Sequence, residues 1–424
     1  MNKQWIMNRL ICGVALGCLS ACSPQEPGPT LTSGSDESET LGEAEVSVAT
    51  PAPSTQPGLY VEDGTLMRNG EEFRAMGINY CSALHDVLKD PETLEVAEGF
   101  RILKQDYGIP FVRLNGGPYA HTQWKMYVED PEEYLRRFDV LVKHAEEQGI
   151  GLIPSLFWFV VTMPDLAGEP ISALGDPDSQ CRTFMRQYIR DVVGRYKDSP
   201  AIWGWEVGNE WMLYVDLPKL EHLPPQKIGS EEVRTAADKL LRPMILNAYE
   251  DFYKTVREID PDRIIVTGDS IARTQAWHNR NDDSWGQDSK AQWTEVFRAD
   301  TPGPYEVASF HLYAEAEKSY FKNENLPLED FVTEVVGICR SDNKVIWNGE
   351  LGMPGTDEAA REMFFRMMHA VEENEIEISA IWNFKPQGTF QADWDISPTN
   401  ERAYMLDAVK ELNGRFSRGL GNAE

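Results

Sequence analysis

The feature that most constrains this chain is a regular alternation between short, continuous apolar runs and longer amphipathic stretches. Eight such runs follow one another between residues 73 and 382. Continuous apolar runs are expected for parallel strands that are buried on both faces of a sheet. The predicted strands are Phe73–Asn79, Pro110–Asn115, Gly151–Phe157, Ile202–Val207, Arg263–Thr267, Val307–His311, Lys344–Gly349 and Ile378–Trp382.

The stretches between these runs have the spacing of amphipathic helices. The apolar residues of Pro131–Gln148 fall on one helix face, and similar patterns run from Glu231 to Ile259 and from Thr356 to Asn374. Asp176-Pro177 predicts the start of another helix, with an aspartate cap and a proline in the first turn.

Eight strands with intervening helices predict an α/β fold, a (β/α)8 TIM barrel. The alternative is a doubly wound open sheet, which would usually carry a glycine-rich phosphate turn after an early strand. The first run ends in Gly77-Ile78-Asn79-Tyr80 and lacks that motif, so the barrel is the better interpretation. A short β-hairpin precedes it, because the turn dipeptides Asp63-Gly64 and Asn69-Gly70 interrupt small apolar segments.

The N-terminal segment is interpreted as an export signal. Lys3 and Arg9 precede the apolar run Leu10–Leu19, which is too short to span a bilayer, and Leu19-Ser20-Ala21-Cys22 resembles the bacterial lipobox. We expect residues 1–21 to be a lipoprotein signal peptide, and Cys22 to carry the lipid; the alternative is an ordinary secretory signal peptide cut nearby. A lipid-anchored protein is expected at the cell envelope. The outer membrane is favoured because the residue after Cys22 is Ser23 and not Asp, as in outer-membrane lipoproteins of Gram-negative bacteria.

Composition sets the domain boundaries and the partners. Residues 22–57 are rich in Pro, Ser, Thr and Glu and are expected to form a flexible linker, followed by one folded domain over residues 58–416. The chain has 69 acidic and 40 basic residues, a net charge of −29, so nucleic acid is excluded as a partner and membrane contact is expected only through the lipid. We expect a monomer.

Cysteine usage gives no sign of a metal or cofactor. Cys12 and Cys18 leave with the signal, and Cys81, Cys181 and Cys339 remain, which allows at most one disulfide. No CxxC or Cys/His zinc spacing is present, so we expect no metal and no cofactor, and the three cysteines are more readily explained as core residues.

Polar residues collect at the ends of the predicted strands, where barrel enzymes place their chemistry. The second strand ends in Val112-Arg113-Leu114-Asn115, Asn209-Glu210 follows the fourth, and Glu350 follows the seventh. Strands four and seven lie across a barrel from each other, so the two glutamates can face one space. Two carboxyl groups across a cleft are what glycoside hydrolysis requires, and a separation of about 5–5.5 Å indicates a retaining mechanism.

Neighbouring side chains fit this interpretation. Arg113 is expected to keep Glu350 ionised, Asn209 to bind a sugar hydroxyl, and Tyr313 to orient Glu350. Glu206 is an unusual charge within a buried run, and by strand alternation it would share a face with Glu210; we interpret it as a structural acid.

These motifs, in this order, resemble glycoside hydrolase family 5, within clan A of the (β/α)8 glycosidases. The resemblance runs from about Leu59 to the last helix and rests first on Leu66-Met67-Arg68-Asn69-Gly70 and Phe73–Asn79. It also includes Asn209-Glu210 and Trp347-Asn348-Gly349-Glu350. It implies that Glu210 is the acid/base and Glu350 the nucleophile. It also implies sugar-site roles for Arg113, Asn209, His311, Tyr313 and Trp382.

Two departures from the family pattern add aromatic residues. Trp211 follows Glu210 where proline is frequent, and strand three ends in Leu156-Phe157-Trp158-Phe159 where many members have histidine. We therefore include Trp158 and Trp211 among the candidate substrate-binding residues, although core packing is as good an explanation for any single tryptophan. Val215–Gly229 is an insert that either walls off one end of the cleft or forms plain surface.

The predicted function is a retaining β-glycosidase acting on β-1,4-linked glucan or mannan, or on their oligosaccharides. An inactive, glycan-binding barrel is the alternative, and the presence of both acids argues against it. A metal-dependent barrel hydrolase would usually need His-x-His near the first strand, and Asn79-Tyr80-Cys81-Ser82 lacks it.

Overall fold

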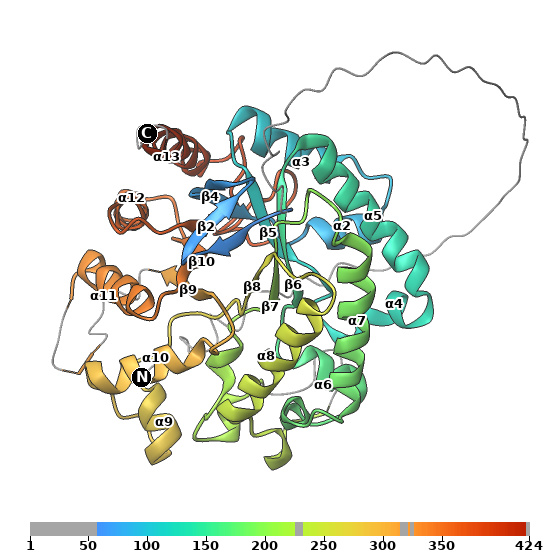
Figure 1. The fold of residues 1–424 in the computed structure, drawn as a ribbon, viewed down its shortest axis with the longest axis vertical. Helices are drawn as coiled ribbons and strands as arrows, with labels where there is room; N and C mark the ends of the chain where they lie inside the picture. Colours follow the sequence, from blue (N-terminus) through green and yellow to red (C-terminus); the bar gives the residue numbers. More distant parts are fainter. Residues whose placement is uncertain (1–56, 225–231, 314–320, 323–325, 421–424) are drawn as a thin grey trace, which may run out of the picture. The chain divides into compact units, whose positions relative to one another are not determined.

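The computed structural model describes residues 57–224, 232–313, 321–322 and 326–420, and it confirms the barrel. Eight parallel strands pair in the order β8-β7-β6-β5-β4-β11-β10-β9, and β8 and β9, at the two ends of this order, are in contact. The sheet therefore curls into a nearly closed ring with helices around it (Figure 1). The strands are β4 (Ala75–Asn79), β5 (Phe111–Asn115), β6 (Gly151–Phe157), β7 (Gly204–Gly208), β8 (Ile264–Val266), β9 (Val307–Tyr313), β10 (Val345–Gly352) and β11 (Ile378–Ile381).

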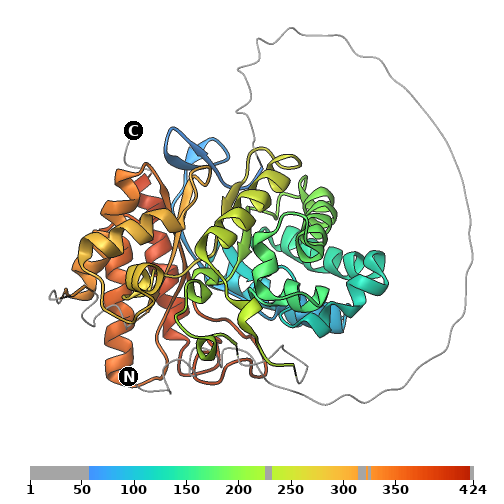
Figure 2. The same cartoon turned by 90° about the horizontal axis from the view of Figure 1, so that it is seen from below.

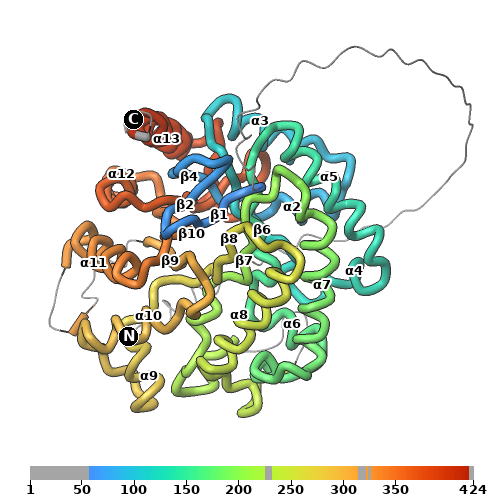
Figure 3. The backbone as a smooth tube through the Cα atoms, viewed as in Figure 1, coloured from blue at the N-terminus to red at the C-terminus, as the bar shows by residue number. Residues whose placement is uncertain are grey.

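Helices connect successive strands and cover the outside of the barrel, as the tube in Figure 3 shows. Their apolar faces pack on the strands to form the larger hydrophobic core. Among the described helices, none combines the length and apolar character that crossing a bilayer would need. The helices are α2 (Ala83–Lys89), α3 (Glu95–Arg101), α4 (Lys125–Glu129), α5 (Pro131–Gln148), α6 (Thr162–Ala167), α7 (Gln180–Tyr196), α8 (Arg242–Arg257), α9 (Ala276–Asp282), α10 (Lys290–Asp300), α11 (Leu328–Ser341), α12 (Glu358–Glu373) and α13 (Tyr404–Leu420).

The predicted hairpin is present and gains a third strand. β1 (Tyr60–Glu62), β2 (Thr65–Arg68) and β3 (Glu71–Glu72) form a small antiparallel sheet at one end of the barrel strands (Figure 2). Both predicted turns, at residues 63–64 and 69–70, have positive φ, which explains their Asp-Gly and Asn-Gly sequences. A second apolar cluster, inside the barrel, includes hairpin residues and closes this end. Its members are Leu59, Leu66, Ala75, Phe111, Ile153, Trp203, Ile264, Val266, Val307, Val345, Trp347, Ile378 and Ala380.

Two helix boundaries differ from the prediction. Asp176 does not cap a helix: its Oδ1 accepts from the Asp178 backbone N–H at 2.9 Å in a turn, and Ser179 caps α7 instead. The pattern from Glu231 to Ile259 also becomes helical late, because α8 begins only at Arg242, with Pro243 in its first turn. The helices α5 and α12 match the predicted ranges to within two residues.

Several predictions from the N-terminal region lie outside the described residues. These are the signal peptide, the lipidation of Cys22 and the linker. Within the described residues, Cys81, Cys181 and Cys339 are buried, and no disulfide joins any two of them. Burial raises the pKa of the Cys181 thiol to about 11, as expected for an unreactive core side chain.

Candidate active site

Arg113, the middle residue of β5, is wholly buried and binds several of the other site residues. It lies between two carboxylates: its Nη2 is 2.7 Å from Glu206 Oε1, and its Nη1 is 2.8 Å from Glu350 Oε1. The same guanidinium donates to the side-chain oxygens of Asn79, at 3.1 Å, and Asn209, at 2.7 Å. Burial alone would lower the pKa of Arg113, but the two carboxylates outweigh burial and raise it, so the group stays cationic.

Glu350 lies within β10, where a bulge re-aims the chain. The pairing between β10 and β9 skips a residue at Gly349, so that Glu350 lies opposite His311. A side chain at Gly349 would come within 2.9 Å of the His311 ring, which explains the glycine. The Tyr313 hydroxyl donates to Glu350 Oε2 at 2.5 Å, and Arg113 binds Oε1, so both oxygens of this carboxylate are held.

Glu210 lies just beyond β7, at the start of a 3-10 turn over Trp211–Tyr214. Its backbone is left-handed, with φ of 55°, a conformation that costs a non-glycine residue roughly 1–2 kcal/mol. His311 Nδ1 lies 3.0 Å from Glu210 Oε1 and 3.5 Å from Glu350 Oε2, between the two acids. One carboxylate oxygen from each glutamate and a histidine nitrogen all lie within 4.8 Å of one another.

Glu206 is a structural acid beneath the site, as interpreted from the sequence. Alternation along a strand does not extend to Glu210, because the chain leaves β7 at Gly208 and turns left-handed. Instead, Glu206 accepts two hydrogen bonds from Arg113 and one from Trp347 Nε1 at 2.9 Å. Trp347 belongs to the same strand as Glu350, so this buried acid ties Arg113 to the strand that carries Glu350.

Two of the predicted tryptophans lie beside the acids. The Arg113 guanidinium is 4.6 Å from the centre of the Trp158 ring, and that ring is 6.1 Å from the Trp382 ring. The Trp382 Nε1 donates to Gln391 at 2.8 Å, which fixes the indole. The two rings are tilted by 31° and retain 6% and 5% exposure, so they form an aromatic wall next to the carboxylates.

The structure does not bring Trp211 to that wall. Its side chain is 1% exposed, packs against Tyr249, and donates from Nε1 to the backbone oxygens of Phe157 and Trp158. The left-handed turn at Glu210 directs the next side chain into the core. Trp211 therefore supports the loop after β6 and does not offer a ring face at the surface.

Sequence reasoning missed two side chains that the structure places at the site. Asn79, at the end of β4, accepts from Arg113 and donates to the Gly349 carbonyl at 2.9 Å, and its place as the last residue of a predicted strand was a usable signal. Trp394 packs edge-on against Tyr313 with the ring centres 5.6 Å apart. It comes from a loop far along the chain, and no local pattern marks it.

Glu210, His311 and Glu350 are the described residues whose ligand atoms are grouped closely enough to hold a metal ion. Their chemistry does not favour that use, because Arg113 already supplies a cation to Glu350 and Tyr313 supplies a donor. The donor set instead suits two carboxyl groups that face one reacting centre, one held by Arg113 and Tyr313 and the other beside His311.

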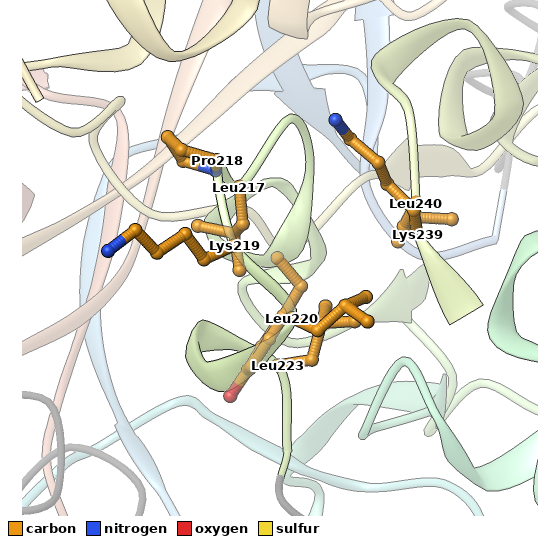
Figure 4. Close-up of a pocket in the computed structure, with 8 residues that line it drawn as sticks. Leu217, Pro218, Lys219, Leu220, Leu223, Lys239 and Leu240 are labelled. Carbon is orange, nitrogen blue, oxygen red and sulfur yellow. The ribbon is translucent and has the colours of Figure 1, made fainter. Parts of the chain in front are cut away.

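The described part of the insert after β7 lines a small separate hollow (Figure 4). Neither glutamate lines it. Residues 225–229 of the insert lie outside the described residues. The lining residues are Tyr214, Leu217, Pro218, Lys219, Leu220, Leu223, Lys239 and Leu240.

The fold and the site together define a (β/α)8 barrel with a paired-carboxylate centre at the C-terminal ends of its strands. A sequence model of the family described as "Cellulase (glycosyl hydrolase family 5)" matches residues 68–388, more than half of the chain. The chain therefore belongs to glycosyl hydrolase family 5, as its motifs predicted.

Curated relatives match over shorter segments. A probable mannan endo-1,4-β-mannosidase A of Aspergillus clavatus is 33% identical over 128 residues, which are 26% of this chain and 35% of the relative. Mannan endo-1,4-β-mannosidase A of Podospora anserina is 38% identical over 117 residues, 24% of this chain and 30% of the relative. The chain thus spans about a third of the length of these curated relatives.

Solved structures match over most of the chain and support the fold. The endo-1,4-β-mannanase of Rhizomucor miehei has a TM-score of 0.61 at 16% identity, covering 85% of this chain and 99% of that one. The endo-β-1,4-mannanase of Thermotoga petrophila has a TM-score of 0.58 at 16% identity, covering 83% of this chain and 78% of that one.

Proposed function

We propose that this protein is a retaining β-glycosidase that cleaves β-1,4-linked mannan by double displacement, with Glu350 as nucleophile and Glu210 as acid/base. The observation that carries the proposal is the close approach of the two carboxylates, with an oxygen of each within 4.8 Å. Inverting enzymes hold their carboxyl groups about 6.5–9.5 Å apart to admit a water, whereas retaining enzymes hold them about 5–5.5 Å apart.

The surroundings of the two acids differ in the way the two roles require. Glu350 contacts a permanent cation, Arg113, and the Tyr313 hydroxyl, so both oxygens of its carboxylate are held in place for attack on the anomeric carbon. Glu210 contacts His311 instead and has a side chain that is 17% exposed, compared with 6% for Glu350. An acid that delivers a proton to a departing sugar and then takes one from water needs this access.

The reaction follows from these positions. A Glu350 oxygen attacks the anomeric carbon and the bond to the leaving oxygen breaks, while Glu210 gives that oxygen its proton. Water then attacks the same carbon, passes a proton to Glu210 and releases Glu350. Asn209, whose side-chain oxygen Arg113 holds at 2.7 Å, presents its amide N–H groups to the neighbouring hydroxyl, and Trp382 and Trp158 flank the ring.

We propose mannan rather than glucan as the substrate because the curated relatives matched are mannan endo-1,4-β-mannosidases. Their match covers only a part of each chain, so the sugar requires a direct test. Linear β-1,4-mannan, glucomannan and carboxymethyl cellulose should be compared, with product sizes measured.

The central experiment is hydrolysis by Glu350→Gln and Glu210→Ala. We expect Glu350→Gln to lose at least a thousandfold in kcat/KM on β-mannan while it remains folded. We expect Glu210→Ala to regain turnover of an activated aryl β-glycoside when azide is added, because azide needs no base. Near-wild-type hydrolysis by Glu350→Gln would overturn the assignment.

We also propose that the chain is exported and held at the bacterial cell envelope, with the outer membrane favoured, by a lipid on Cys22. The lipobox-like Leu19-Ser20-Ala21-Cys22 supports this. Labelled palmitate should mark the wild-type protein in cells but not Cys22→Ser. Equal labelling of the two, or no labelling of the wild type, would refute the anchor.

A further inference from the structure

The turn that carries Glu210 is held by the segment that follows β8, Thr267-Gly268-Asp269. The Gly208 N–H donates to the Thr267 carbonyl at 3.3 Å, and the Glu210 N–H donates to the Gly268 carbonyl at 2.9 Å. A side chain at Gly268 would come within 2.0 Å of the Gly208 carbonyl oxygen, so only glycine permits this close approach. These two backbone hydrogen bonds hold the chain at and just before Glu210, the residue with the left-handed backbone.

Asp269 holds the chain just after Glu210. Its Oδ1 accepts from the Met212 backbone N–H at 3.0 Å, two residues beyond Glu210. Its Oδ2 accepts from the Tyr249 hydroxyl of α8 at 2.7 Å, and the Ser309 hydroxyl of β9 donates to its backbone oxygen at 3.2 Å. Asp269 is 2% exposed, so this carboxylate has been withdrawn from water to make these contacts.

We propose that Asp269 is a positioning residue for Glu210: it clamps the turn after β7 so that the Glu210 carboxyl stays against His311 and within reach of Glu350. The proposal rests on the proposed acid/base role of Glu210. Asp269 acts indirectly: its carboxylate holds the Met212 N–H, and Glu210 lies between that contact and the Gly208 contact with Thr267.

The burial of Asp269 supports a specific role. Burial raises the pKa of its carboxyl to about 6, although the Met212 N–H, the Tyr249 hydroxyl and the Thr267 hydroxyl all favour the charged form. His311 on β9 also lowers the pKa of this carboxyl, by its charge. A carboxylate kept in so costly a place must hold something that an apolar side chain would not.

The chemistry provides a readout that separates positioning from general damage. In the first step, a poor leaving group departs only with a proton from Glu210, whereas dinitrophenolate departs without one. A displaced acid therefore slows the cleavage of poor leaving groups selectively. A merely destabilised protein loses activity on both substrates in proportion.

The experiment compares kcat/KM for 2,4-dinitrophenyl and phenyl β-mannobioside, with the cellobiosides in parallel, for the wild type, Asp269→Ala, Asp269→Asn and Glu210→Ala. We expect Asp269→Ala to lose at least tenfold on the phenyl substrate and less than threefold on the dinitrophenyl one. Asp269→Asn should lose less than threefold on both, because its oxygen can still accept from Met212 and its amide can donate to the Tyr249 oxygen.

Asp260→Ala is the matched control. Asp260 is also a buried aspartate, 3% exposed, but it precedes β8 and binds Trp205 Nε1 and Arg263, each at 2.8 Å, at the opposite end of the same strand. Its loss should lower stability without changing the ratio between the two substrates.

Two outcomes would overturn the proposal, and they differ from failure of the proposed function. If Glu210→Ala shows the leaving-group dependence and Asp269→Ala loses both substrates equally, Asp269 is structural only. If Asp269→Ala matches the wild type on both substrates, the clamp is dispensable. If Glu210→Ala itself shows no leaving-group dependence, the acid/base assignment fails first.

Discussion

Replacing Asp269 by asparagine should change how stability depends on pH. In the folded protein the pKa of this carboxyl is raised from 3.8 to about 6 by burial. Between these values the folded state binds a proton that the unfolded state does not, so stability falls as pH rises through this range. At one pKa unit per 1.36 kcal/mol, the ionised Asp269 costs the folded state about 3 kcal/mol at neutral pH.

Asparagine carries no charge at any pH, so Asp269→Asn should be free of this cost. The free energy of unfolding of the variant minus that of the wild type should rise by about 2 kcal/mol from pH 4 to pH 7.5. The rise is smaller than the full cost because part of the cost is already present at pH 4. Other groups titrate in both proteins and largely cancel in the difference, although the pKa of buried Asp300, itself raised to about 7, includes a contribution from the Asp269 charge.

Urea unfolding of both proteins at pH 4, 5, 6, 7 and 7.5, followed by tryptophan fluorescence, measures this difference directly. The two curves of unfolding free energy against pH should diverge from pH 4 to about 6 and then run parallel. A difference that stays constant, or that favours the wild type increasingly toward neutral pH, would refute the reasoning that burial sets the pKa of Asp269.

Three further predictions follow from the site. Glu206→Gln places a donor amide against the Arg113 and Trp347 donors, so kcat/KM should fall at least tenfold. Near-normal activity in a folded variant would show that Glu206 is not needed to hold Arg113 in place. Trp382→Ala should raise KM about tenfold, because the loss of one aromatic face costs roughly 1–1.5 kcal/mol of binding, and kcat should change less. An unchanged KM in initial-rate measurements would show that Trp382 does not contribute to substrate binding. Millimolar EDTA should leave hydrolysis within twofold, since Arg113 and Tyr313 already satisfy Glu350, whereas loss restored by a divalent ion would revive the metal-dependent alternative.

The barrel was predictable because continuous apolar runs are a direct consequence of burial on both faces of a parallel strand. The predicted strand Gly151–Phe157 matches β6, and the ends of β9 and β10 extend past the predicted His311 and Gly349 by two and three residues. These extensions, Leu312-Tyr313 and Glu350-Leu351-Gly352, follow His311 and Gly349, which interrupt the continuous apolar run and so end the predicted strand early.

The site was predictable as a set of strand ends, and less so as an arrangement of side chains. Arg113, His311, Tyr313 and both glutamates meet because parallel strands end at one edge. The direction of Trp211 depends on the left-handed conformation at Glu210, and a backbone dihedral of that kind leaves no mark when the residue is not glycine. Trp394 contacts Tyr313 only because of the tertiary fold.

The small N-terminal sheet also determines from which side the protein can be attached. The Leu59 N–H donates to the Trp203 carbonyl, and the Leu59 carbonyl accepts from the Ile264 N–H, both at 2.8 Å, just before β7 and at the start of β8. The chain therefore joins the barrel at its floor, at the end of the strands opposite Glu210 and Glu350. A bead or a fused domain joined directly before Gly58 would therefore attach at the end of the barrel that lies opposite Glu210 and Glu350.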